Sequence, residues 1–357
     1  MKIPMVDLRP VLEATEAAWR ANLARLFDRM HFILGEQVAA FEAELAVAFG
    51  AKYAVAVGSG TAAIELGLRA IGLGESGAEV IVPALTSPFT AQAVLAAGCR
   101  PRFADVDEQH LLLAPDLPIT RRTRAIVPVH LYGQPCDLPA LLPPGLPLVE
   151  DACQAHGAPV AGRVTAYSFY PTKNLPCLGD GGAVTTDSAR IAARLRSLRD
   201  GGRRHNDQIA RERALNSRLD EIQACYLRAF LPKLADWNAE RVRLARLYDD
   251  ALAGCDPVRP VVRRPGSVCH LYVVRARRRD PLRRFLADRG ILTGVHYPVP
   301  LHLQPAFRES RQPKGSFPVA ERACREILSL PLWPGMSQSN VGEVAQQIRK
   351  FYDSRGR

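Results

Sequence analysis

The sequence predicts an α/β protein with a large, mostly parallel sheet domain and a smaller α/β domain at its C-terminal end. From residue 53 onward, short apolar runs alternate with stretches in which apolar residues recur at helical spacing. This alternation is typical of a parallel sheet covered by helices on both faces. The chain of 357 residues also exceeds one ordinary domain, and three prolines and a glycine gather at 257–266. We therefore expect a large domain over 1–255 and a small domain over 256–357.

The individual elements follow from local patterns in the chain. Apolar residues spaced three and four apart predict helices, and short apolar runs bounded by glycine, proline or polar residues predict strands. A break is expected near Pro232 in the longest helical pattern. The expected helices cover 11–30, 36–49, 62–71, 88–97, 188–200, 219–253, 281–289, 319–329 and 338–352, and the expected strands cover 53–57, 79–82, 124–129, 146–149 and 268–275.

The overall composition narrows the class of protein. Hydrophobic residues make up 47% and charged residues 23% of the chain, as in ordinary globular proteins. No apolar run approaches the roughly 20 residues needed to cross a bilayer, and the first residues lack a secretory signal pattern. The eight cysteines and eight histidines show no metal-ligand spacing. We therefore expect a cytoplasmic protein with no membrane association and no metal site.

The net charge of +11 could indicate a nucleic-acid partner or an affinity for small anions. The basic residues are dispersed along the chain, and no aromatic residues alternate with them as stacking on bases requires. We expect no nucleic-acid partner, whereas a phosphorylated substrate is compatible with this charge.

A glycine turn follows the first expected strand. Residues 58–61 read Gly-Ser-Gly-Thr and lead directly into a helix that begins near Ala62. Glycines let the backbone approach a ligand closely, and N–H groups at a helix start attract an anion. The turn could hold a phosphate, although a simple helix cap would show the same residues.

Two further loops carry reactive groups. Residues 150–157 follow the strand 146–149 and contain Asp151, Gln154 and His156. Lys173 follows an apolar run and precedes the glycines at 179–182, which predicts a turn between two further strands, in a chain with only six lysines among 47 basic residues. Arginine cannot supply a neutral amine, whereas lysine can form a Schiff base with a carbonyl. The unremarkable alternatives are a helix cap for Asp151 and a solvated turn lysine.

The three loops together fit pyridoxal phosphate. Strand-end loops of such a sheet lie at one edge, where they would bring an anion cradle, a carboxylate and an amine together. The cofactor's phosphate needs N–H and hydroxyl donors, its ring nitrogen needs a carboxylate, and its aldehyde needs a lysine.

The sequence resembles the DegT/DnrJ/EryC1/StrS family of sugar aminotransferases, and the resemblance extends over nearly the whole chain. It implies the pyridoxal-phosphate-dependent transferase fold type I. The motifs that carry it lie at 32–35, 59–63, 105–107, 128–133, 150–158, 168–174, 179–182, 216–219, 296–302 and 330–335.

The resemblance implies a role for each matching residue. Lys173 would bind the cofactor aldehyde and move the proton, and Asp151 would pair with the pyridine nitrogen. Gln154 would lie near the phenolic oxygen. Asn216 would reach the phosphate of the other subunit's cofactor, which implies a homodimer with shared active sites. The phosphate would lie against Gly60, Thr61, Ala62 and Ser168, and the sugar near His296 and Tyr297.

One position departs from the family pattern. Many members carry an aromatic residue directly after the threonine at the position of Thr86, where it stacks on the cofactor ring. This chain has Ser87 there, and the nearest aromatic residue is Phe89. Either Phe89 contacts the ring or its face is covered differently.

The resemblance implies transfer of an amino group from L-glutamate, or glutamine, to a keto group of a nucleotide-linked deoxysugar. The loop 296–302 is more similar to that of members acting at C-3 than at C-4. A cyclitol (inosose) aminotransferase is the alternative within the transferases. A cofactor-dependent dehydratase would carry histidine in place of Lys173, and a regulatory binding protein would not need the catalytic set.

Overall fold

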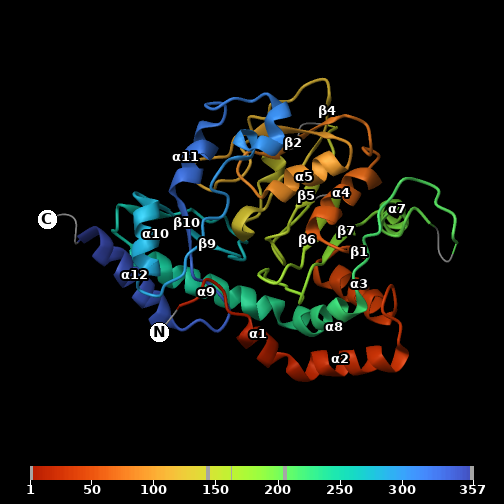
Figure 1. Ribbon diagram of the computed structural model, residues 1–357, viewed down its shortest axis with the longest axis horizontal. Helices are drawn as coiled ribbons and strands as arrows, with labels where there is room; N and C mark the ends of the chain where they lie inside the picture. The colour runs from red at the N-terminus through yellow and green to blue at the C-terminus, as the bar shows by residue number, and fades with distance from the viewer. Residues whose placement is uncertain (1–2, 142–144, 162, 204–206, 354–357) are drawn as a thin grey trace.

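A central sheet flanked by helices forms most of the molecule, and a smaller unit lies beside it (Figure 1). The structure is a computed structural model that describes residues 3–141, 145–161, 163–203 and 207–353. Within those ranges no helix is long and apolar enough to cross a membrane. The predicted α/β class is confirmed.

The large sheet is assembled from two hydrogen-bonded groups of strands. One has the order β1-β7-β6-β5 and the other β3-β2-β4. Parallel bridges from Ile126 to Leu148 and from Val129 to Asp151 place β4 beside β5, which makes the order continuous. β7 is antiparallel to both of its neighbours, whereas the other paired strands of the sheet are parallel. The sheet is therefore mostly parallel, as predicted. The strands are β1 (Tyr53–Val57), β2 (Glu79–Pro83), β3 (Arg100–Ala104), β4 (Thr123–Ile126), β5 (Val149–Asp151), β6 (Val164–Ser168) and β7 (Gly182–Thr186).

The helices around this sheet largely follow the predicted positions. The predicted helix over 11–30 is two helices instead, separated at Thr15, whose hydroxyl donates to the Val11 carbonyl at 2.8 Å. The predicted break near Pro232 is confirmed as a short 3₁₀ turn. The helices are α1 (Arg9–Ala14), α2 (Glu16–Arg29), α3 (Glu36–Ala48), α4 (Gly60–Ala70), α5 (Pro88–Ala96), α6 (Leu138–Leu141), α7 (Ala189–Arg199), α8 (Glu221–Phe230) and α9 (Leu234–Leu252).

The small unit is an antiparallel sheet with helices packed on it. Its strands β8 (Val258–Pro260), β9 (Tyr272–Ala276) and β10 (Ile327–Leu330) have the order β10-β9-β8. Its helices are α10 (Arg279–Ala287), α11 (Pro318–Glu326) and α12 (Gln338–Asp353). The prediction of helix over 319–329 was wrong at its end, because residues 327–330 pair with β9.

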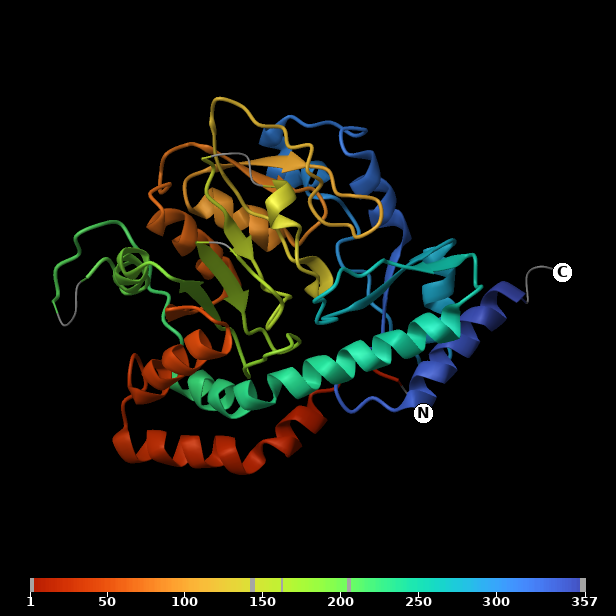
Figure 2. The same cartoon turned by 180° about the vertical axis from the view of Figure 1, so that it is seen from behind.

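α9 joins the two parts of the molecule. Figure 2 shows α8 and α9 end to end, running from beneath the large sheet to the small unit. Leu234 and Trp237 pack into a core with residues of the large sheet. Tyr248 packs into the core of the small unit, where its ring stacks on that of Tyr272 with 4.7 Å between centroids. The boundary near 255 stays a prediction, since one helix belongs to both cores.

A buried carboxylate fixes the start of α3 against α8. Glu221 is 1% exposed and accepts hydrogen bonds from three backbone N–H groups, those of Gly35, Gln37 and Val38, at 2.7–2.9 Å. These donors belong to the first turn of α3, where no intrahelical partner exists. A negative charge at a helix start is also favoured by the helix dipole.

We predict that Glu221→Ala lowers the free energy of unfolding by about 2–4 kcal/mol, because three buried N–H groups lose their acceptor. Chemical denaturation followed by circular dichroism measures the change. Glu343→Ala, on the exposed face of α12, is the matched control and should change stability by less than about 0.5 kcal/mol. Equal stabilities of the two variants would contradict the assigned role.

Candidate active site

The three loops predicted to form the site meet at Gly60. A Cβ atom placed on Gly60 would lie 2.6 Å from Cβ of Ser168 and 2.8 Å from Sγ of Cys153. No side chain fits at such distances, so glycine is required for the loops after β1, β5 and β6 to touch. The structure thus brings together the residues that the sequence placed on separate strand ends.

The start of α4 presents backbone donors at this meeting point. The Ser59 hydroxyl caps the helix by accepting the Ala62 N–H at 3.1 Å. The Gly58 N–H donates to the Ser217 hydroxyl at 3.1 Å. Thr61 is half-buried, so the first turn combines a hydroxyl with the positive end of an 11-residue helix.

Asp151 lies at the end of β5 and is 4% exposed. One carboxylate oxygen accepts the Thr90 hydroxyl at 2.7 Å, and the other accepts the Cys153 N–H at 3.1 Å. These bonds fix the carboxylate in one orientation. Sequence reasoning missed Thr90, which lies 61 residues before Asp151 in the chain.

Phe89 is the residue for which the sequence predicted a cofactor contact. It lies on the first turn of α5 and is 64% exposed. Its helix neighbour Thr90 is buried against Asp151. The contact between Phe89 and the cofactor ring stays a prediction.

Gln154 is held from two sides. Its Oε1 accepts the Tyr132 N–H at 2.7 Å, and its Nε2 donates to the Tyr297 hydroxyl at 2.6 Å. Tyr297 comes from the loop after β9 and α10 and has a left-handed backbone with φ of +74°. A tyrosine in this conformation is uncommon. The predicted cofactor residue Gln154 and the predicted substrate residue Tyr297 therefore form one hydrogen-bonded pair.

Lys173 lies half-buried on the turn after β6. Burial lowers the pKa of its amine, and the nearby Cys153 and Asp151 oppose this effect only in part. A lowered pKa makes the neutral amine easier to reach at physiological pH. The residue thus has the property that nucleophilic and proton-transfer chemistry requires of a lysine.

Neutral histidines surround this lysine. Burial, followed by the charge of Lys173, lowers the pKa of His296 to about 4 and that of His156 to about 3. Nδ1 of His296 lies 2.7 Å from the Ser329 hydroxyl, and Nε2 of His156 donates to the Ser168 carbonyl at 2.8 Å. Both imidazoles are therefore uncharged near pH 7.

Asn216 lies on the segment that follows α7. Its backbone pairs with that of Asp200 in an antiparallel bridge. The next residue, Ser217, is the one that accepts the Gly58 N–H. The segment therefore touches the glycine turn within one chain, and sequence reasoning did not identify Ser217.

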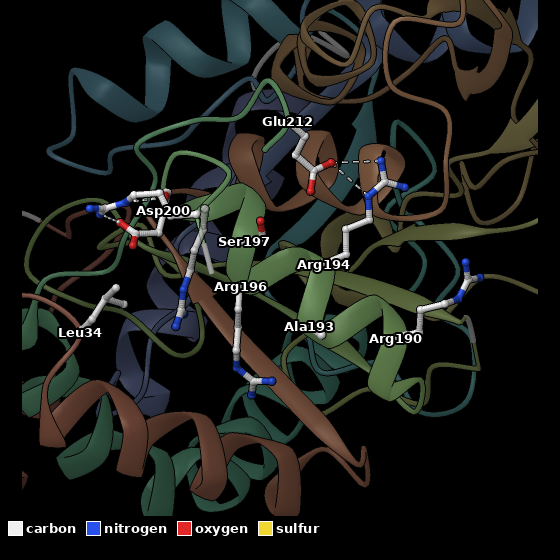
Figure 3. Close-up of a pocket in the computed structure, with 10 residues that line it drawn as sticks. Leu34, Arg190, Ala193, Arg194, Arg196, Ser197, Asp200 and Glu212 are labelled. Carbon is white, nitrogen blue, oxygen red and sulfur yellow. Dashed lines mark hydrogen bonds and ion pairs between the residues drawn. The ribbon is translucent and has the colours of Figure 1, made fainter. Parts of the chain in front are cut away.

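A cavity of about 800 Å³ lies beside this segment (Figure 3). None of the residues predicted to bind a cofactor lines it. The arginines come mostly from α7, and Arg194 forms an ion pair with Glu212. Its lining consists of Leu34, Arg190, Ala193, Arg194, Arg196, Ser197, Arg199, Asp200, Arg203 and Glu212.

Comparisons with known proteins agree with this geometry. A profile of the DegT/DnrJ/EryC1/StrS aminotransferase family matches residues 14–349. The dTDP-3-amino-3,4,6-trideoxy-alpha-D-glucose transaminase of Streptomyces venezuelae is 43% identical, with 98% of this chain and 96% of the relative covered. The UDP-N-acetyl-3-dehydro-alpha-D-glucosamine 3-aminotransferase of Acidithiobacillus ferrooxidans is 38% identical, with 98% and 97% covered.

A solved structure is similar over the same length. The crystal structure of S. venezuelae DesV in complex with a ketimine intermediate has a TM-score of 0.94 and 43% identity, with 98% of each chain covered. Family profile, relatives and fold agree over nearly the full sequence. The chain belongs to the DegT/DnrJ/EryC1/StrS aminotransferase family.

Proposed function

We propose that the protein is a pyridoxal-phosphate-dependent sugar aminotransferase. It would move an amino group from L-glutamate, or glutamine, to the C-3 keto group of a nucleotide-linked deoxysugar. The observation that carries this proposal is a half-buried lysine of lowered pKa beside a buried, hydrogen-bonded aspartate. A helix start and a close glycine contact complete the same site.

The donor set fits pyridoxal phosphate. The close contact at Gly60 sets Ser168 against the start of α4, so the backbone N–H groups of that first turn and the hydroxyls of Thr61 and Ser168 would hold the phosphate together. Asp151 would hold the ring nitrogen, and Gln154 would lie near the phenolic oxygen. When bound, this cofactor withdraws electrons from the substrate carbon that carries the nitrogen.

Lys173 would perform the proton transfer. Its amine would bind the cofactor aldehyde and, once released, would hold at Nζ the proton that moves between the substrate carbon and the aldehyde carbon of the cofactor. Burial favours this, because it lowers the amine pKa. The neutral His296 and Tyr297 would line the sugar side of the site without adding charge near Nζ.

The sugar position is supported by the names of the relatives. The two relatives described above are both named for an amino group at C-3 of a nucleotide-linked sugar. The net charge of +11 is compatible with a nucleoside diphosphate carrier. We therefore favour a 3-keto sugar nucleotide over a cyclitol, which has no phosphate-linked carrier.

The active form would be a homodimer with shared active sites. Phe27, Met30 and Phe32 are 55%, 67% and 37% exposed on the edge next to Leu34, which lines the 800 Å³ cavity beside α7. Such an apolar edge favours a second copy of the chain as its cover. In that dimer Asn216 would reach the phosphate of the partner's cofactor.

We predict that Lys173→Ala abolishes amino transfer, because no other amine can bind the cofactor at this position. Purified wild-type protein should be yellow, and the variant should lose the absorbance band of the lysine-bound cofactor. Lys233→Ala, a lysine at the start of α9, is the control and should keep both. Normal turnover by Lys173→Ala would refute the mechanism.

We predict that mixed dimers show whether Lys173 and Asn216 of one site come from different subunits. Asn216→Ala should retain cofactor less well than wild type. A heterodimer of Lys173→Ala and Asn216→Ala subunits holds one site with both residues intact, so it should recover about half of the wild-type activity per dimer, as follows from two-fold symmetry. Steady-state assays of tagged heterodimers measure this. Activity no higher than that of the two homodimers would contradict a shared site.

The substrate is tested with the enzyme loaded in its amine form. Addition of a 3-keto sugar nucleotide should restore the yellow colour, because the amino group leaves the cofactor. Inososes and 4-keto sugar nucleotides are the comparison set. Faster return of colour with either of them would replace the assigned substrate class.

A further inference from the structure

A set of buried amides and imidazoles lies directly behind Lys173. Asn174 follows the lysine in sequence and is 3% exposed. Its Nδ2 donates to Oδ1 of Asn238 at 2.8 Å and to the Val268 carbonyl at 3.0 Å, and its Oδ1 lies 3.1 Å from Nδ1 of His270. One side chain thereby connects the lysine turn to α9 and to the small unit.

The position of each proton in this set follows from the partners. The Val268 carbonyl can only accept, so the Asn174 nitrogen faces it and the Asn174 oxygen faces His270. His270 must therefore carry its proton on Nδ1. The Asn238 nitrogen donates to the His156 carbonyl at 2.8 Å in the same way, which leaves the Asn238 oxygen for Asn174.

The side chains of this set hold the lysine turn at residues where backbone hydrogen bonds do not. The Lys173 N–H donates to the Tyr170 carbonyl at 2.9 Å, and the Cys177 N–H donates to the Phe169 carbonyl at 2.7 Å. Between these bonds, residues 174–176 make no backbone–backbone hydrogen bond to any part of the chain that the structure describes. On the C-terminal side of Lys173, the Asn174 amide is thus the polar tether.

All members of the set are uncharged near pH 7. Burial and the charges of Lys173 and Arg241 lower the pKa of His270, and burial and Lys173 lower that of His156. Besides these imidazoles, the charged or titratable groups around the lysine are Asp151 at the end of β5, Cys153 just after it, Arg241 on α9, and His296 on the loop after α10. Arg241 donates to the His270 carbonyl, at 3.3 Å, and so fixes the residue from its other side.

We propose that Asn174, Asn238 and His270 are positioning residues that hold the Lys173 amine at a fixed, water-poor place in the site. The proposal rests on the assignment of Lys173 as the cofactor-binding lysine. None of the three needs to touch the reacting atoms. They act on Lys173 through the turn that carries it. Asn238 lies on α9, and His270 lies just before β9 in the small unit.

The test is a pH titration of the absorbance band of the lysine-bound cofactor in holoenzyme, and the quantity measured is the midpoint pH of that titration. Asn238→Leu and His270→Leu keep the side-chain size but remove the hydrogen bonds, so the turn loosens and water reaches the lysine nitrogen. Water stabilises the charged form, and the midpoint should therefore rise by roughly one pH unit. kcat should fall, whereas KM for the sugar nucleotide should change less than about twofold, because the substrate contacts are unaltered.

A conservative variant separates positioning from general stability. The amide nitrogen of His270→Asn occupies the place of Nδ1 and can still donate to Asn174, so this variant should titrate like wild type. Asn22→Leu is the matched control, because Asn22 also donates to a backbone carbonyl, that of Cys225 at 3.0 Å, but far along the chain from the site. It should leave the midpoint unchanged even if it lowers the unfolding temperature.

The outcomes distinguish failure of the proposed function from failure of the positioning role. Wild-type protein without any lysine-dependent band would refute the assigned function itself. A normal band in wild type, with an unshifted midpoint in His270→Leu, would overturn the positioning role. Equal shifts in His270→Leu and His270→Asn would overturn it as well. If Asn238→Leu fails to fold, the His270 pair alone decides.

Discussion

The close contact at Gly60 is the constraint on which the site depends. Ser168 and Cys153 lie so near to this glycine that no Cβ could stand between them. Glycine at this position lets the ends of β1, β5 and β6 come within touching distance, which a parallel sheet alone does not guarantee. The helix start, the carboxylate and the amine therefore face one small volume. Reversal of β7 next to β1 and β6 brings the chain back from the lysine turn into the sheet without a crossover.

Much of the site could be predicted because its residues lie next to strand ends. Asp151 and Lys173 each follow an apolar run, and the family motifs contain both. Thr90, Tyr132 and Ser217 could not be predicted in this way. Their contacts join segments far apart in the chain, such as Tyr132 with Gln154 and Ser217 with Gly58. No local pattern reports such a pairing.

In the fold, too, elements set by their own residues were predicted, whereas elements set by pairing with distant strands were not. The strand 53–57 was predicted with its observed bounds, since a run of small and β-branched apolar residues ends at glycine. β3 was missed because three of its five residues are proline or arginine. It is a strand because β2 pairs with it in register. β10 was taken for the end of a helix, although its pairing with β9 ends α11. In both cases tertiary pairing overrides the local preference.

α9 contributes to the core below the large sheet at one end and to the core of the small unit at the other. The two parts of this enzyme are thus not modules joined by a linker. A chimera that takes its small unit from another family member would have to bring a matching second half of α9 with it. The loop carrying His296 and Tyr297, which is proposed to face the sugar, is joined to β10 by the bridge between Gly294 and Ser329 and would be exchanged with the small unit. Recombination among relatives would therefore need junctions within α9, or would exchange single loops only.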